Sequence, residues 1–96
     1  MEADARIKML RAQIDDLDEQ LVKLLNQRAA CAVEIGHLKK MLGLEVYQPE
    51  RELAVHEHVR SANQGPLAQD AVTRLFERII DEARRLERLA KTNEHT

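Results

Sequence analysis

The sequence predicts an all-α protein with three helices per chain, a long first, a short second and a medium third, in an intertwined homodimeric helical bundle. Only three glycines and two prolines interrupt the 96 residues. Ala, Leu, Glu, Arg and Gln, which favour helix, are abundant. Apolar residues recur at spacings of three and four along most of the chain. A chain this short makes one domain at most, so we expect residues 1–96 to form a single domain.

The first predicted helix runs from about Ala5 to Leu42, and Gly43 is the first residue expected to end it. At 1.5 Å per residue this helix is about 55 Å long, whereas a compact domain of 100 residues has a radius of gyration of about 13 Å. The far end of the helix must therefore pack on another chain. The apolar residues that form its heptad seam are Ile7, Leu10, Ile14, Leu17, Leu21, Leu24, Cys31, Ile35, Leu38 and Leu42.

Two shorter helices are expected after a connection over residues 43–48. Pro49 suits the first turn of a second helix that ends near Ala62. The run Asn-Gln-Gly-Pro at residues 63–66 is the clearest turn signal in the chain. Apolar residues at helical spacing then predict a third helix from about Leu67 to Lys91, followed by a frayed tail over residues 92–96.

Composition argues against several classes of protein. The net charge is −2, with 15 basic and 17 acidic residues interspersed, and only Tyr47 and Phe76 could stack on bases, so nucleic-acid binding is not expected. No apolar run reaches the roughly 18 residues that span a membrane, and the N-terminal segment lacks the apolar core of a secretion signal. We expect a cytoplasmic protein. Cys31 is the only cysteine and is interpreted as a small buried thiol.

Two cations share one face of the first helix. Arg28 stands where the seam calls for an apolar residue, either as a polar residue that sets the pairing register or as part of an anion site. Lys39 follows eleven residues later, almost three full turns and about 16 Å along the axis. Taken alone, Lys39 is more simply a solvated lysine beside Lys40.

Charged residues also border the apolar faces of the other two helices. Glu87 continues the third helix's apolar row, although it could instead be exposed and paired with Arg84 or Lys91. Arg51 and Glu52 open the second helix just after its proline. Local partners could satisfy Arg51 through Glu45 or Glu50, and Arg11 through Asp15. Taken together, near-core charges on three helices favour a bound anionic ligand.

At this point the sequence resembles a known family, the all-helical chorismate mutases, in particular the small dimeric bacterial type. The order and spacing of the matching segments are specific, and they cover nearly the whole chain. The segments are Leu10-Arg11, Ile14 to Asp18, Leu24 to Arg28, Val33 to Lys39, Pro49 to Glu52, and Arg74 to Phe76 leading to Ile79-Ile80.

The resemblance implies rearrangement of chorismate to prephenate, in phenylalanine and tyrosine biosynthesis, without metal or cofactor. It implies that Arg11 and Arg28 bind the substrate carboxylates and that Arg51 supports that region. Lys39 would donate to the ether oxygen of chorismate, and Glu87 would be the second donor to the same atom.

Three further positions follow from the resemblance. Glu52, with the backbone at Gln48, would hold the ring hydroxyl. Some relatives have aspartate at the place of Gln48, which matters little if the backbone makes the contact. Some have serine where this chain has Ala83, so one hydroxyl contact is missing here. Many have glutamine in place of Glu87.

The reaction is an intramolecular Claisen rearrangement, so the enzyme must orient the substrate and stabilise charge rather than supply a nucleophile. Guanidinium groups suit two carboxylates, and fixed donors suit an ether oxygen that gains negative charge. Glu87 can donate only when protonated, so activity is expected to fall as pH rises. Arg11 and Lys39 are about 42 Å apart along one helix, so Arg11 must come from the partner chain across the interface.

The leading interpretation is a monofunctional chorismate mutase acting on this small dianionic substrate. An isochorismate pyruvate lyase resembles the same fold, and the Arg51-Glu52 pair favours the mutase over it. A non-catalytic helical dimerisation module is the rival from another class, in which Arg28 and Glu87 would be structural. Docking of the dimer to another shikimate-pathway enzyme is also left open.

Overall fold

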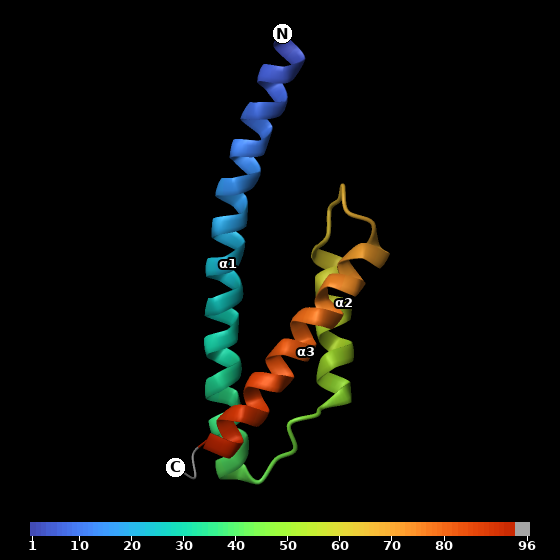
Figure 1. Cartoon of the computed structure of the whole chain (residues 1–96). Helices are drawn as coiled ribbons and strands as arrows, with labels where there is room; N and C mark the ends of the chain where they lie inside the picture. The colour runs from blue at the N-terminus through green and yellow to red at the C-terminus, as the bar shows by residue number, and fades with distance from the viewer. Residues whose placement is uncertain (94–96) are drawn as a thin grey trace. The chain divides into compact units, whose positions relative to one another are not determined.

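The computed structural model describes residues 1–93, and every regular element in that range is an α-helix. The helices are α1 (Glu2–Leu42), α2 (Pro49–Ala62) and α3 (Gln69–Asn93) (Figure 1). The all-α prediction of a long, a short and a medium helix is therefore confirmed. Along the chain the structure divides into two compact units, of which the first is Met1–Ala30 and the second begins at Cys31.

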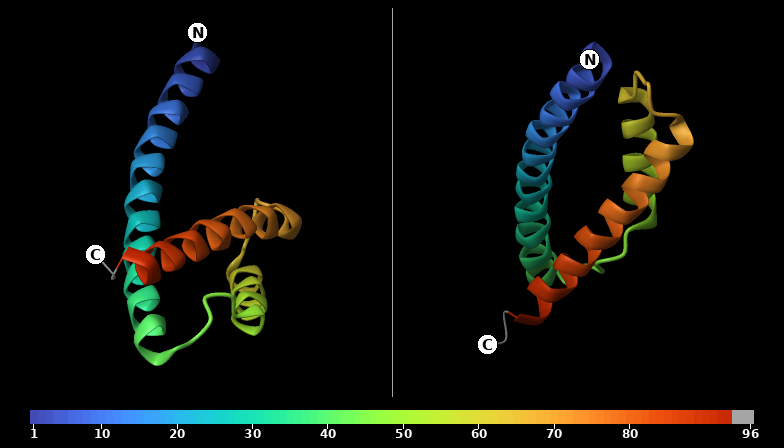
Figure 2. Two further views of the ribbon diagram at one scale, coloured as in Figure 1. Left: turned by 60° about the horizontal axis from the view of Figure 1, so that its bottom comes forward. Right: turned by 45° about the horizontal axis from the view of Figure 1, so that its top comes forward.

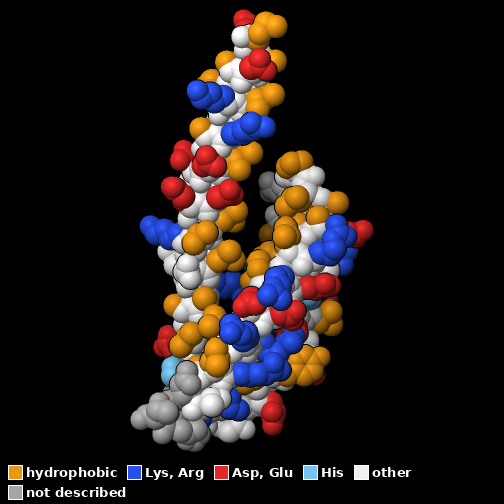
Figure 3. Space-filling model, in the orientation of Figure 1, with side chains coloured by type: hydrophobic (Ala, Val, Ile, Leu, Met, Phe, Trp, Pro, Cys, Tyr) orange, Lys and Arg blue, Asp and Glu red, His pale blue; other side chains and the backbone are white. Residues whose placement is uncertain are grey.

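Apart from Met1, the first unit consists of α1 residues, and their apolar seam is open to solvent. Ile14, Leu17, Leu21 and Leu24 each expose more than half of their surface. Apolar side chains are visible along this part of α1 in the space-filling view of Figure 3. A stripe this long leaves water only by packing on a second apolar surface.

The end of α1 is set by Gly43. Its φ of +69° is a left-handed conformation that glycine adopts without a steric penalty. The Gly43 N–H donates to the Lys40 carbonyl at 3.3 Å, and the Leu44 N–H donates to the Lys39 carbonyl at 2.8 Å. These two hydrogen bonds form a Schellman motif, which confirms the predicted end at Leu42.

The second unit contains the last turns of α1 together with α2 and α3. α2 and α3 pack side by side, and the C-terminal part of α3 crosses α1 near its end (Figures 1 and 2). Gly36 makes the crossing close, since a Cβ there would lie 2.7 Å from the Glu87 carbonyl oxygen and 2.9 Å from the Ala90 Cβ. The small apolar core consists of Ala32, Val46, Val55, Val72, Ile80 and Ala90.

The start of α3 is two residues later than predicted. Asn63 stabilises the connection before α3, because its amide donates to the Leu67 carbonyl at 2.9 Å and to the Gln69 side chain at 3.1 Å. The helix then runs from Gln69 to Asn93, so the prediction of a tail from Thr92 is wrong for its first two residues. The rest of that tail, residues 94–96, lies outside the described residues.

Cys31 was expected to be buried, and that expectation is wrong. The thiol is exposed in the single chain. Cys31 belongs to the same seam as Ile35 and Leu38, both of which are also exposed. The apolar pattern around Cys31 was therefore correctly located, but no part of the described chain covers it.

Candidate active site

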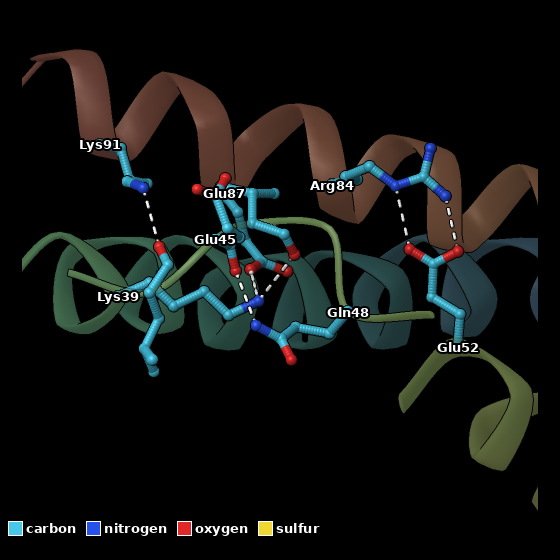
Figure 4. A network of polar contacts seen from close by, with 9 residues as sticks. Lys39, Glu45, Gln48, Glu52, Arg84, Glu87 and Lys91 are labelled. Atoms are coloured by element: carbon cyan, nitrogen blue, oxygen red, sulfur yellow. Dashed lines mark hydrogen bonds and ion pairs between the residues drawn. The ribbon is translucent and has the colours of Figure 1, made fainter. Parts of the chain in front are cut away.

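Lys39 and Glu87 face each other across the crossing of α1 and α3. The Lys39 Nζ lies 2.6 Å from the Glu87 Oε1, and each side chain is 14% exposed (Figure 4). Lys39 also donates to the Val46 carbonyl at 2.9 Å. An ammonium group has three donors, so one N–H of Lys39 remains for a ligand. Gly36 lies one turn before Lys39 on α1, and its close contact with Glu87 brings the two side chains together.

Glu52 and Arg84 form a second ion pair, between the first turn of α2 and the middle of α3. The Arg84 Nε donates to the Glu52 Oε2 at 3.0 Å, and the Nη2 donates to the Oε1 at 2.6 Å (Figure 4). Each side chain is 23% exposed. The hydrogen bond to Glu52 raises the pKa of Arg84 above its already high usual value, so the guanidinium stays charged.

Two lysines, one on α1 and one on α3, bind the backbone of the connection between α1 and α2. Lys39 binds the Val46 carbonyl, and the Lys91 Nζ donates to the Leu44 carbonyl at 2.8 Å. The Gln48 side-chain amide donates to the Glu45 carbonyl at 3.0 Å within the same segment. These bonds fix the backbone that leads to Glu52.

The remaining candidate residues lie in different surroundings. Arg51 is exposed at the start of α2, and Ala83 is partly buried on α3, one turn before Glu87. Arg11 and Arg28 belong to the first unit, where Arg11 is exposed and Arg28 is partly buried. The second unit thus gathers Lys39, Glu87 and Glu52 with the backbone near Gln48, but it contains neither Arg11 nor Arg28.

The local pairings considered for Glu87 from the sequence are wrong. Arg84 binds Glu52 and Lys91 binds the Leu44 carbonyl. Glu87 instead forms its ion pair with Lys39. Lys39 is likewise not a solvated lysine, since only 14% of its side chain is exposed. Sequence reasoning missed Arg84 as a partner of Glu52. The available signal was the spacing of Arg84, Glu87 and Lys91, which places three charges on one face of α3.

Chemically, the described residues of the second unit offer paired charges from different helices. Within residues 1–93, no group of three or more His, Cys, Asp or Glu side chains lies close enough to hold a metal ion. A largely buried ammonium donor beside a carboxyl group is suited to binding an oxygen atom that carries or develops negative charge.

Among residues 1–93 no helix has the length and apolar character to span a membrane.

Comparison with known proteins places these observations in a family. Residues 10–88 match the family described as chorismate mutase type II. The chain is 38% identical over 91 residues to a bifunctional chorismate mutase/prephenate dehydratase of Pseudomonas aeruginosa, covering 90% of this chain and 25% of the relative. A protein of the same name from Neisseria gonorrhoeae is 42% identical over 78 residues, 81% of this chain and 21% of the relative. The chain thus spans about a quarter of the length of these curated relatives.

A solved structure is similar to this chain over almost its whole length. It is a chorismate mutase (form II) from Thermus thermophilus, with a TM-score of 0.84 and 32% identity. The likeness covers 86% of this chain and 94% of that one. The family match extends over most of the chain and includes both halves of the Lys39–Glu87 pair. The chain belongs to the chorismate mutase type II family.

Proposed function

We propose that this chain catalyses the rearrangement of chorismate to prephenate. The observation that carries the proposal is the Lys39–Glu87 pair, largely buried at 2.6 Å on two helices of a chain from this family. One N–H of Lys39 remains free of the two bonds described above. That donor suits the ether oxygen of chorismate, whose negative charge grows in the transition state.

The role of Glu87 as a donor depends on its protonation state. In the structure its carboxyl group accepts a hydrogen bond from Lys39. A carboxyl group can donate to the ether oxygen only when it is protonated, whereas a carboxylate can only accept. Glu87 can therefore act as a second donor only in its protonated form, whereas Lys39 donates as an ammonium group.

The other proposed contacts hold the substrate in its reactive conformation. Arg28 and the partner subunit's Arg11 would clamp the two carboxylates, with Arg51 beside them, because planar guanidinium groups bind carboxylates through two parallel hydrogen bonds. Glu52 and the backbone at Gln48 would hold the ring hydroxyl. Ala83 would line the pocket without adding a polar contact.

The proposal requires a homodimer in which each site draws residues from both chains. Arg11 and Lys39 are 28 residues apart on one helix, about 42 Å at 1.5 Å per residue, which is too far for one small substrate. An antiparallel pairing of the two α1 helices about a two-fold axis would supply Arg11 in trans and would cover the exposed seam. Each dimer would then hold two equivalent shared sites.

The relatives also bear on the setting of the activity. Two of them are named as bifunctional proteins that join a chorismate mutase to a prephenate dehydratase, an enzyme that consumes the product proposed here. This association supports docking to another enzyme of the same pathway and a place in the cytoplasm as extensions of the proposal.

One assay tests the proposed function. The purified protein is mixed with chorismate, the loss of chorismate absorbance is followed, and prephenate and pyruvate are both quantified. We expect prephenate alone. Pyruvate release would identify a lyase, and no turnover would leave a non-catalytic dimerisation module.

A matched pair of lysine variants links that activity to the site. Lys39→Ala should lower kcat by about 100-fold or more, as expected when one transition-state donor is removed. Lys23→Ala, an exposed lysine on the same helix, should leave kcat unchanged. Normal turnover by folded Lys39→Ala would remove Lys39 from the mechanism.

A further inference from the structure

The carboxylate of Glu52 is held in one orientation by Arg84. Both Glu52 oxygens accept a hydrogen bond from the guanidinium, at 3.0 and 2.6 Å, in the parallel two-bond geometry (Figure 4). The last torsion of a free glutamate is broad, so an unrestrained carboxylate samples many orientations. Two parallel bonds to a planar partner select one of them.

The rest of Glu52 is fixed from its own helix. Glu52 lies in the first turn of α2, and its backbone N–H donates to the Gln48 carbonyl at 3.1 Å. The start of α2 thus fixes the Glu52 backbone and Arg84 fixes its carboxylate. Because α3 supplies Arg84, it supports both Glu52 and Lys39, the latter through Glu87.

Arg84 is itself restrained on two further sides. Its Cζ lies 5.2 Å from the centroid of the Tyr47 ring, within the range of a cation–π contact. Its Nη1 lies 3.5 Å from the Asp81 Oδ1, one turn earlier on α3. The guanidinium is therefore set in place before any ligand arrives.

The pairing leaves Glu52 able to bind a ligand. A carboxylate oxygen accepts about two hydrogen bonds, and Arg84 uses one acceptor position on each. The side chain keeps 23% of its surface exposed, so the remaining positions can be reached. A hydroxyl group of a ligand can therefore donate to Glu52 while the carboxylate stays bound to Arg84.

We propose that Arg84 is a positioning residue, which orients Glu52 to accept the ring hydroxyl of the substrate without touching the substrate itself. This inference rests on the proposed function, because it assigns Arg84 to substrate recognition at the same site. Tyr47 assists by supporting the guanidinium plane.

The test uses Arg84→Met and Arg84→Lys, each made alone and in a Glu52→Gln background, with chorismate as the substrate. Arg84→Met should raise KM by about tenfold, the loss expected for one hydrogen bond to a charged group, and should change kcat less than about threefold. Arg84→Lys keeps the charge without the two-bond geometry and should recover part of the loss. The control is Arg85→Met, because Arg85 is an exposed neighbour whose side chain lies 3.9 Å from Glu82.

The Glu52→Gln background distinguishes a positioning role from direct contact. If Arg84 acts through Glu52, Arg84→Met should add less than about twofold to KM once Glu52 is changed, since the two residues then form one coupled unit. An equal KM factor in both backgrounds would mean that Arg84 contacts the substrate and would overturn the inference. So would variants whose melting temperature falls while KM stays at the wild-type value.

These outcomes separate the inference from the proposed function. No turnover by the unaltered chain would overturn the proposed function and this inference with it. Normal turnover by the unaltered chain, with unchanged KM in both Arg84 variants, would overturn the inference alone.

Discussion

The two units of this chain differ in how their side chains are accommodated. In the first unit the apolar seam is exposed, with more than half of the surface of Leu17 and Leu21 open to solvent. In the second unit charged side chains from different helices form ion pairs, namely Lys39–Glu87 and Glu52–Arg84. The second unit therefore pairs these four charged side chains within one chain, and the first is patterned for a surface that one chain does not provide.

The largest effect should come from placing a charge on the exposed seam. Leu21→Asp puts a carboxylate at the centre of the proposed pairing surface, where burial of an unpaired charge costs several kcal/mol. A cost of about 3 kcal/mol raises the dimer dissociation constant by about a hundredfold. Sedimentation equilibrium should show monomers at concentrations where the unaltered chain is dimeric, and activity should fall in parallel.

Asn26→Asp is the matched control, because position 26 lies on the face of α1 away from the seam and the new charge stays in water. This variant should remain dimeric and active. A Leu21→Asp protein that is as dimeric as the unaltered chain would show that the seam is not the pairing surface.

In the second unit, the close crossing of α1 and α3 should be sensitive to added side-chain volume at Gly36. Glycine to alanine in a helix ordinarily stabilises by roughly 0.5–1 kcal/mol. At Gly36 the added Cβ would meet the Glu87 backbone at 2.7 Å, and overpacking of this kind costs about 1–3 kcal/mol. Gly36→Ala should therefore lower the melting temperature, and it should lower kcat by moving Lys39 away from Glu87.

Gly43→Ala provides the comparison for Gly36→Ala. Nothing lies within 4 Å of a Cβ at that position, and the cost there comes from the left-handed backbone alone, about 1–2 kcal/mol. Thermal denaturation and kcat measured together should show Gly43→Ala less stable but still active. A Gly36→Ala protein with a raised melting temperature would contradict the close crossing of α1 and α3.

The smallest expected effect concerns the donor role of Glu87. Glu87→Gln replaces a group that donates only when protonated with an amide that donates at any pH. The ratio of variant to wild-type activity should rise with pH, measured as kcat/KM from acid to alkaline conditions. Glu77→Gln, an exposed glutamate on the same helix, should give a constant ratio. A constant ratio for Glu87→Gln as well would remove its donor role.

Local signals in the sequence were sufficient for most of the fold. Gly43 and Pro49 located the end of α1 and the start of α2 correctly, since each imposes its own backbone geometry. The start of α3 was misplaced because Asn63 bonds forward to Leu67 and Gln69, an arrangement that composition does not reveal. Cys31 was misjudged because a seam pattern indicates burial without telling which chain provides it.

The site was harder to predict than the fold because its contacts join residues far apart in sequence. Lys39 and Glu87 are 48 positions apart, and Glu52 and Arg84 are 32 apart. Sequence reasoning chose partners one turn away, such as Arg84 for Glu87, because only those spacings can be derived without a tertiary structure. The resemblance to a family supplied residue roles, but it did not identify Arg84 as the partner of Glu52.

The central claim is that residues of the two units from different chains complete one site, and mixing two inactive variants tests it directly. Arg11→Ala and Lys39→Ala proteins are each purified, mixed in equal amounts, allowed to exchange subunits, and assayed with chorismate. Random exchange makes half of the dimers mixed with one intact site each, so activity should recover to about a quarter of the unaltered protein. Mixed dimers that form but show no recovery would contradict a site shared between chains.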